Sequence, residues 1–412
     1  MLAHDVAGGS LPAPSWLIGY IGAFVVLITA VSLRSAWPAA RLALASPETD
    51  EPVDPASDAI PSVPRRIGHS VGLLLLIAVF AIAIAGPDSG AANLAPTSVL
   101  VVWWVGLPLV CLLVGDVMAA VNPFAPAVRL LVQRRETTRP PAPPWTAAAF
   151  VAAFSWFLLA YHRPGSPSAL AVFLAVYVIA ALAGALWWGP VWLRDGEGFA
   201  GLSRAIALLS PRRGGGPPAG LLALVVVWLG GTAFKALSLT TFWLDVLGTN
   251  RGWDRTFLDT VGLVWMIGTV AAVALAILHL TERGSDGDER AASATRLGLA
   301  LVPLAFGWFL AQNLSFLLLE GQNFYILLSD PIGRGWDLFG TIDHTPDYQL
   351  AQGEWIRWAQ MGALLATHVA CVVLAHDGAI ASVGRRQGLR TTWCVAVAAS
   401  ASIVAAAMLV VG

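Results

Sequence analysis

Charged side chains are scarce in this chain. Lysine and arginine together number 24 and aspartate and glutamate 25, so charged residues make up 12% of the 412 positions, whereas soluble domains average about 25%. Hydrophobic residues make up 57%, which excludes a fold whose whole surface faces water. The formal net charge of −1 excludes the dense basic face on which nucleic-acid binding depends. We therefore expect no nucleic-acid partner, and a lipid bilayer as the surroundings.

Cysteine is also scarce. Cys111, Cys371 and Cys394 all lie in apolar stretches at irregular spacing, so the sequence indicates neither a disulfide framework nor a set of zinc ligands. We expect these residues to be small core side chains. Long polar stretches are missing too, which leaves no room for a separate soluble domain.

Apolar stretches long enough to span a membrane recur along the whole chain. A helix needs roughly 20 mostly apolar residues to cross the hydrocarbon layer, and tryptophan stands at many of the segment ends, as is typical of the interface between lipid and water. We predict an all-α, polytopic transmembrane helical bundle of about ten spans, forming a single transmembrane domain over 1–412 in the plasma membrane. The segments are 16–33, 67–85, 99–118, 145–161, 169–187, 221–239, 257–279, 297–319, 355–374 and 393–411.

The distribution of arginine predicts the topology. Cytoplasmic loops retain basic residues during insertion, and the first, third, fifth, seventh and ninth loops hold most of the basic residues in this chain. We therefore expect the N-terminus and the C-terminus to lie outside the cytoplasm. The arginines of these five loops are Arg34, Arg41, Arg65 and Arg66; Arg129, Arg134, Arg135 and Arg139; Arg194, Arg204, Arg212 and Arg213; Arg283, Arg290 and Arg296; Arg385, Arg386 and Arg390.

One tetrapeptide, Arg-Gly-Trp-Asp, occurs twice. Its copies lie at 251–254 and 334–337, both in loops predicted to face outward, and polar residues precede each copy at comparable places. This pattern indicates a duplicated helix pair over 219–280 and 295–378. A tetrapeptide can also recur by chance in a chain of this length, so both interpretations stay open.

Polar side chains inside the predicted spans are few. An ionisable group in the bilayer costs roughly 2.5 kcal/mol or more, so each one marks a functional candidate. Lys235, Asn313 and Glu320 lie in the outer halves or at the outer ends of the sixth and eighth spans. In the ninth span, the spacing of Arg357 and His368 returns them to one face of a helix. We expect these groups to converge on one outward-facing pocket.

The loop predicted over 320–354 is long for a connection between membrane helices and is rich in carboxylates and aromatic rings. Such a loop is expected to fold over something. We predict a catalytic set bordering one outward cavity, where a divalent metal or a carboxylate would activate water. This set is Glu320, Asp330, Asp337 and His368, with substrate contacts expected from Lys235, Asn313, Tyr325, Trp336 and Arg357. The alternative is that these side chains cap helices, pin the loop and join helices by hydrogen bonds.

His4 lies in a short tail that is predicted to face outward. Cleavage of an upstream signal sequence after Ala3 would leave His4 at the N-terminus. An N-terminal histidine offers its amine and a ring nitrogen to a metal, copper above all. We therefore name His4 as a candidate metal ligand.

Several stretches together resemble a known family. They are Ala3-His4 with Pro12, Pro14 and Trp16; Asn122-Pro123-Phe124; Ser329-Asp330-Pro331 followed by 335–341; and Ala375-His376-Asp377. The chain is similar along its length to the actinobacterial membrane proteins catalogued as fenitrothion-hydrolase-like. The resemblance implies hydrolysis of a thiophosphate triester by a membrane-embedded enzyme, with a second membrane subunit as a candidate partner. The motifs themselves specify no mechanism.

Three functions therefore stay open. The first is a membrane hydrolase with an outward site built from the eighth and ninth spans and their loop. The second is a transporter or metal-handling permease, in which Lys235, Glu320 and His368 line a path. The third is a non-catalytic membrane subunit. Polar residues confined to the outward half of the spans favour a site over a channel.

Overall fold

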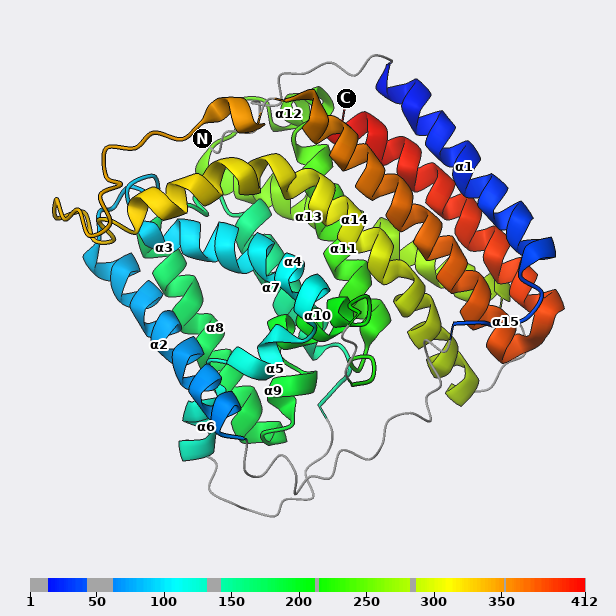
Figure 1. The fold of residues 1–412 in the computed structure, drawn as a ribbon, viewed down its shortest axis with the longest axis horizontal. Coiled ribbons are helices and arrows are strands. Elements are labelled where there is room, and N and C mark those ends of the chain that lie inside the picture. Colours follow the sequence, from blue (N-terminus) through cyan, green and yellow to red (C-terminus); the bar gives the residue numbers. More distant parts are fainter. Residues whose placement is uncertain are drawn as a thin grey trace. The chain divides into compact units, whose positions relative to one another are not determined.

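A computed structural model of the protein describes residues 14–42, 62–131, 142–211, 215–281, 287–351 and 353–411. These residues form helices and connecting loops with no strand among them (Figure 1), which confirms the predicted all-α class. Contacts divide the chain into two units. Unit 1 comprises Met1–Thr49, Gly220–Ser315 and Ala351–Gly412; unit 2 comprises Asp50–Ala219 and Phe316–Leu350.

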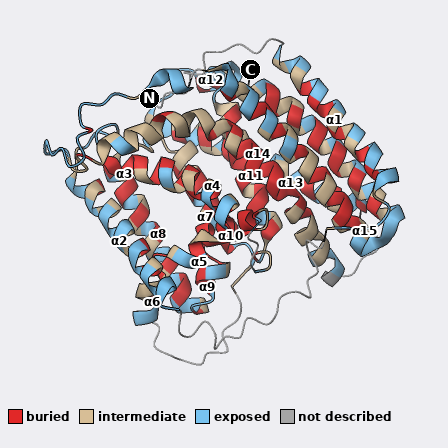
Figure 2. Ribbon diagram, viewed as in Figure 1, coloured by how far each residue is buried: buried red, intermediate tan, exposed pale blue. Residues whose placement is uncertain are grey.

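Eight helices in the described part of the chain are long and apolar enough to cross a membrane. The protein is thus a multi-pass membrane protein with lipid around it. Fewer helices than predicted segments meet this criterion because helix α15 holds the ninth and tenth segments, and because α7 (Thr146–Leu159) has only 14 residues. Large apolar side chains cover outer faces, among them Leu74 and Ile84 on α2 (Val63–Ala85), as expected for contact with lipid (Figure 2).

Unit 1 is built around the long helix α15 (Glu354–Ala406). This helix breaks at Gly384, whose φ of 75° lies in the left-handed region that favours glycine. We call residues 354–383 its first arm and residues 385–406 its second arm. The other elements are α1 (Ser15–Ala36), α11 (Leu221–Ser238), α12 (Thr241–Leu247), α13 (Gly252–Thr281), the first part of α14 (Gly287–Leu327) and the π-helical turn η4 (Ala407–Val411).

The first helix of the chain, α1, packs along the second arm of α15 (Figure 1). A Cβ placed on Gly22 would lie 2.8 Å from Cδ1 of Ile403, and one on Gly19 would lie 3.1 Å from Cα of Val404. Small residues permit such close approach between membrane helices. The beginning of α1 and the end of the second arm therefore lie at the same end of unit 1.

Three loops predicted to be cytoplasmic meet at the opposite end of unit 1. Nη2 of Arg385 donates to the carbonyl oxygen of Arg34 at 3.2 Å, and Nε2 of Gln387 donates to that of Thr281 at 2.5 Å. These contacts join the first, seventh and ninth loops. The assignment of these loops to the cytoplasm stays a prediction.

Unit 2 contains the remaining helices. A buried helix, α10 (Gly198–Ala207), lies at its centre, and every residue of this helix is buried. The surrounding elements are α2, α3 (Leu94–Thr97), the π-helix η2 (Ser98–Gly106), α4 (Leu107–Val114), α5 (Val117–Val121), α6 (Ala125–Leu131), α7, α8 (Pro167–Trp188), α9 (Trp192–Asp195), the end of α14 and, at the boundary, the 3-10 turn η3 (Tyr348–Ala351).

The carboxyl group of Glu197 anchors α10 in unit 2. It is 0% exposed and caps the helix, since its oxygens accept hydrogen bonds from the backbone N–H groups of Phe199 at 3.1 Å and Ala200 at 2.7 Å. The hydroxyl of Tyr177 on α8 donates to the same carboxyl group. Burial raises the pKa of Glu197.

Candidate functional site

His368 is fully buried on the first arm of α15, and both of its ring nitrogens are engaged. Nδ1 lies 2.6 Å from the carbonyl oxygen of Leu364, one helical turn earlier, and Nε2 lies 3.1 Å from Oγ of Ser402. Ser402 lies on the second arm. The break at Gly384 brings the two residues together by returning the chain along itself.

The partners of His368 fix the direction of each hydrogen bond. A carbonyl oxygen only accepts, so Nδ1 of His368 carries a proton, and in the neutral ring Nε2 is left with a lone pair. The hydroxyl of Ser402 must therefore donate to Nε2. Nε1 of Trp308 on α14 donates to the same Oγ at 2.9 Å. The result is a directed chain from Trp308 through Ser402 and His368 to Leu364, which we call the His368 chain.

Sequence reasoning identified His368 but missed Ser402 and Trp308. Ser402 stands in an alanine-rich apolar segment, where a serine is expected to be a small core residue, and no nucleophile motif surrounds it. Trp308 lies in the middle of a span and away from the interface where tryptophan is usual. The sequence feature that could have identified Ser402 is the occurrence of two hydroxyl residues, Ser400 and Ser402, within one predicted span.

A second polar group in unit 1 joins α11 to α14. Nζ of Lys235 donates to Oδ1 of Asn313 at 2.6 Å, so two of the predicted substrate-binding residues are in contact. We expected Lys235 to face other helices, and the hydrogen bond to α14 agrees with this. A carboxylate, Glu320 or Asp245, was the expected partner, whereas this bond is made to an amide.

Glutamine side chains extend this polar group. Nε2 of Gln312 donates to the carbonyl oxygen of Thr232 at 2.7 Å, and Nε2 of Gln360 donates to that of Ala311 at 2.7 Å. Arg357, also predicted to bind substrate, lies one turn before Gln360 on the first arm and is half-buried. These hydrogen bonds join α11, α14 and α15. Joining helices by hydrogen bonds is the structural role considered above as the alternative to a substrate site.

The loop residues of the predicted site belong to unit 2. Glu320 and Tyr325 lie on α14, which continues to Leu327, so the first part of the predicted loop is helical. Oε2 of Glu320 accepts a hydrogen bond from Nδ2 of Asn323 at 2.8 Å. His368, Lys235, Asn313 and Arg357 belong to unit 1. The shared cavity of Glu320, Asp330, Asp337 and His368 therefore stays a prediction.

Asp330 and Asp337 contact the backbone of their own loop. The oxygens of Asp330 accept hydrogen bonds from the N–H groups of Arg334 at 2.8 Å and Gly335 at 2.7 Å, and Oδ1 of Asp337 accepts one from Ile342 at 3.3 Å. The slight burial of Asp330 acts to raise its pKa, but the backbone donors outweigh it and lower the pKa. Both carboxylates thus stabilise turns, and a catalytic role for either stays a prediction.

The two copies of the repeated tetrapeptide adopt different structures. Gly252 begins α13 in the first copy, whereas the second copy, at 334–337, lies in turns of the loop that contains Trp336. The duplicated helix pair therefore stays a prediction.

The predicted metal sites have no further support in the described residues. No three side chains of histidine, cysteine, aspartate or glutamate gather there closely enough to hold a metal ion. His4 lies outside the described residues. Whether a divalent metal acts in this protein stays a prediction.

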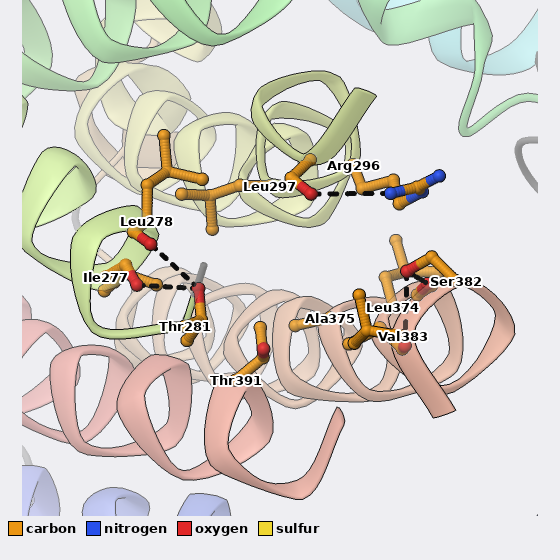
Figure 3. Close-up of a pocket in the computed structure, with 13 residues that line it drawn as sticks. Ile277, Leu278, Thr281, Arg296, Leu297, Leu374, Ala375, Ser382, Val383 and Thr391 are labelled. Carbon is orange, nitrogen blue, oxygen red and sulfur yellow. Dashed lines mark hydrogen bonds between the residues drawn. The ribbon is translucent and has the colours of Figure 1, made fainter. Parts of the chain in front are cut away.

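A small pocket lies between α13, α14 and α15 in unit 1 (Figure 3). Its volume is about 40 Å³, and none of the predicted site residues lines it. The hydroxyl of Thr281 donates to Ile277 and that of Ser382 to Gly378, within their own helices. Arg296 is the charged side chain at its rim, near Ser293 at 3.5 Å. We assign this pocket no chemistry.

Comparison with other proteins gives no guide to the site. No family model matches the chain, and neither a curated protein nor a solved structure matches it significantly.

Proposed function

We propose that this multi-pass membrane protein hydrolyses uncharged esters that reach it through the bilayer, with Ser402 as nucleophile and His368 as general base. The observation that carries the proposal is the His368 chain, in which the Ser402 hydroxyl points at a neutral imidazole nitrogen 3.1 Å away. The same arrangement of hydroxyl, imidazole and orienting acceptor activates serine on unrelated folds. The resemblance described above supports thiophosphate triesters as the substrate class.

The proposed reaction proceeds in two stages. Oγ of Ser402 bonds to the electrophilic phosphorus as its proton moves to Nε2 of His368, and the leaving alkoxide or phenolate takes that proton. Water then attacks the phosphoserine while His368 removes its proton, and Ser402 leaves with a proton restored. The carbonyl oxygen of Leu364 holds Nδ1–H throughout and so stabilises the imidazolium.

A matched set of variants tests this site. Membranes with equal amounts of wild type, Ser402→Ala, His368→Gln and Ser400→Ala are assayed with a thiophosphate triester that releases nitrophenolate. Ser400 is the control because it lies on the same arm and its hydroxyl donates to the carbonyl oxygen of Ala23 at 3.3 Å. We expect the first two variants to lose roughly 100-fold or more in rate, and Ser400→Ala to stay within about twofold of wild type.

Each outcome has a separate meaning. Unchanged rates in Ser402→Ala and His368→Gln would dismiss the site, and no turnover by wild type, with any partner subunit supplied, would count against the hydrolase itself. Glu320→Gln is assayed beside these variants, and a loss of rate confined to it would favour a carboxylate that activates water. Labelling of Ser402 by a fluorophosphonate, read by mass spectrometry, separates a nucleophile from a serine that only joins helices.

The transporter remains the second candidate because of the polar group around Lys235. Oε1 of Gln312 and Oγ of Ser315 are buried without a hydrogen-bond partner among the described residues, so this group has acceptors to offer a polar ligand. We expect Gln312→Leu to abolish ligand-dependent thermal stabilisation by ammonium ions, which donate hydrogen bonds, and to leave ester hydrolysis intact. No stabilisation of wild type by ammonium would remove this candidate and leave the hydrolase and the non-catalytic subunit.

A further inference from the structure

Two hydroxyl side chains, Ser329 and Thr341, lie inside the loop between α14 and η3. Ser329 and Thr341 are 0% and 1% exposed, and their hydroxyl oxygens lie 2.6 Å apart. Oγ of Ser329 also accepts hydrogen bonds from the backbone N–H groups of Phe339 and Thr341, both at 3.2 Å. Ser329 and Thr341 thus form a small buried polar core in the loop, while Asp330 and Asp337 hold its backbone from outside this core.

The apolar side chains of this loop lie on its outside. We call four of them the apolar rim: Trp336, Leu338, Phe339 and Ile342, which are 44%, 59%, 64% and 37% exposed. Leaving apolar surface in water costs about 25 cal/mol per Å², so a loop that faces water normally shows the opposite arrangement. The loop also exposes Arg334, Asp337 and Asp343, so it is amphipathic, and the cost of exposing the rim to water favours an apolar medium over it.

The position of the loop in the chain identifies this medium. The loop follows directly from α14 and leads into α15, and both helices are long and apolar enough to cross a membrane. Gly333 fixes it against a further span, because a Cβ placed there would lie 2.4 Å from Cγ of Pro87, just after the end of α2. The loop is therefore held beside lipid by two membrane helices of unit 2.

We propose that the apolar rim inserts into the interfacial layer of the outer leaflet and anchors the loop to lipid. Trp336 suits the headgroup region, where its ring is amphipathic, and the aliphatic and phenyl side chains suit the upper acyl chains. The assignment to the outer leaflet follows from the arginine alternation. The proposal does not depend on the hydrolase activity, and a protein of any of the three functions would carry this anchor.

Spin labelling of the full chain in phosphatidylcholine liposomes tests the anchor. A nitroxide is attached to Phe339→Cys in a chain whose native cysteines are replaced by serine or alanine, and the control label is at Thr249→Cys, an exposed position in another outward loop. Relaxation by oxygen, which concentrates in lipid, is compared with relaxation by a water-soluble nickel chelate. We expect the ratio of oxygen to nickel effects to be several-fold higher at position 339.

Two results would overturn the anchor. A ratio equal to that of the control would place the rim in water. Protection from both reagents would place it against protein, either a second copy or a separate subunit. If the cysteine-free chain fails to fold, a photoreactive benzoylphenylalanine replaces Phe339 in the native chain. Lipid adducts after illumination support the proposal, and adducts with protein alone contradict it.

Discussion

The carboxylate of Asp377 accepts a hydrogen bond from Nε1 of Trp37 at 2.8 Å and so joins two residues that are 340 positions apart. The same carboxylate accepts the backbone N–H groups of Arg41 at 2.6 Å and Leu42 at 3.0 Å. Next to it, Nε2 of His376 lies 3.0 Å from the carbonyl oxygen of Trp37. The motif Ala375-His376-Asp377 therefore fastens the segment after α1 to the first arm of α15, which is a structural role.

Removal of this carboxylate should destabilise unit 1. In Asp377→Ala, three donors lose their acceptor, and an unsatisfied buried group costs about 1 to 3 kcal/mol. We expect the free energy of unfolding to fall by about 2 to 4 kcal/mol, measured by denaturation in detergent. Asp343→Ala, at an exposed loop position, is the control and should change stability by less than about 0.5 kcal/mol. Equal stability of the two variants would contradict the fastening role.

The indole of Trp308 should affect catalysis through Ser402. Trp308→Phe keeps a large aromatic ring but removes the hydrogen bond to Oγ, which is worth about 1 kcal/mol and corresponds to several-fold in rate. We expect kcat to fall by about that factor with little change in KM. Trp228→Phe is the matched control because Nε1 of this buried indole has no hydrogen-bond partner among the described residues. A similar loss in both variants would point to packing instead.

Adding a side chain at Gly307 should lower the stability of unit 1. A Cβ there would lie 1.8 Å from Oγ1 and 2.7 Å from Cβ of Thr367, so Gly307→Ala forces α14 away from the first arm of α15. Overpacking of this kind costs about 1 to 3 kcal/mol. Gly362→Ala is the control, since nothing lies within 4 Å of the added atom. Thermal unfolding should show a lower midpoint for Gly307→Ala only, and equal midpoints would contradict the close approach.

Glu197 should make the stability of unit 2 depend on pH. Burial raises the pKa of its carboxyl group above the ordinary value of 4.5, so its contribution to stability is complete below that value. This contribution is lost as the pH rises through the raised pKa of the folded state. Glu197→Gln stays neutral, so we expect its thermal midpoint to fall less than that of wild type as the pH rises above 4.5. Parallel curves for the two proteins would show that Glu197 does not titrate in this way.

The sequence predicted helices well because apolar length alone determines which segments cross a bilayer. It could not predict which helices are neighbours, since periodicity describes the faces of one helix at a time. The contact of Ser402 with His368 depends on the break at Gly384, and no local pattern reveals that contact. The amide partner of Lys235 was missed because a carboxylate, Glu320 or Asp245, was expected to pair with its charge, whereas the fold placed Asn313 opposite it.

The packing of α1 against the second arm of α15 sets an order on biogenesis. Helix α1 finds its partner only when the second arm has been made, and all of unit 2 is synthesised in between. Until then the glycine-lined face of α1 has only lipid, or an insertion chaperone, to cover it. In a chain that terminates before the second arm, this face of α1 therefore stays uncovered by its partner. Membrane quality control could recognise an unfinished protein by this exposed face.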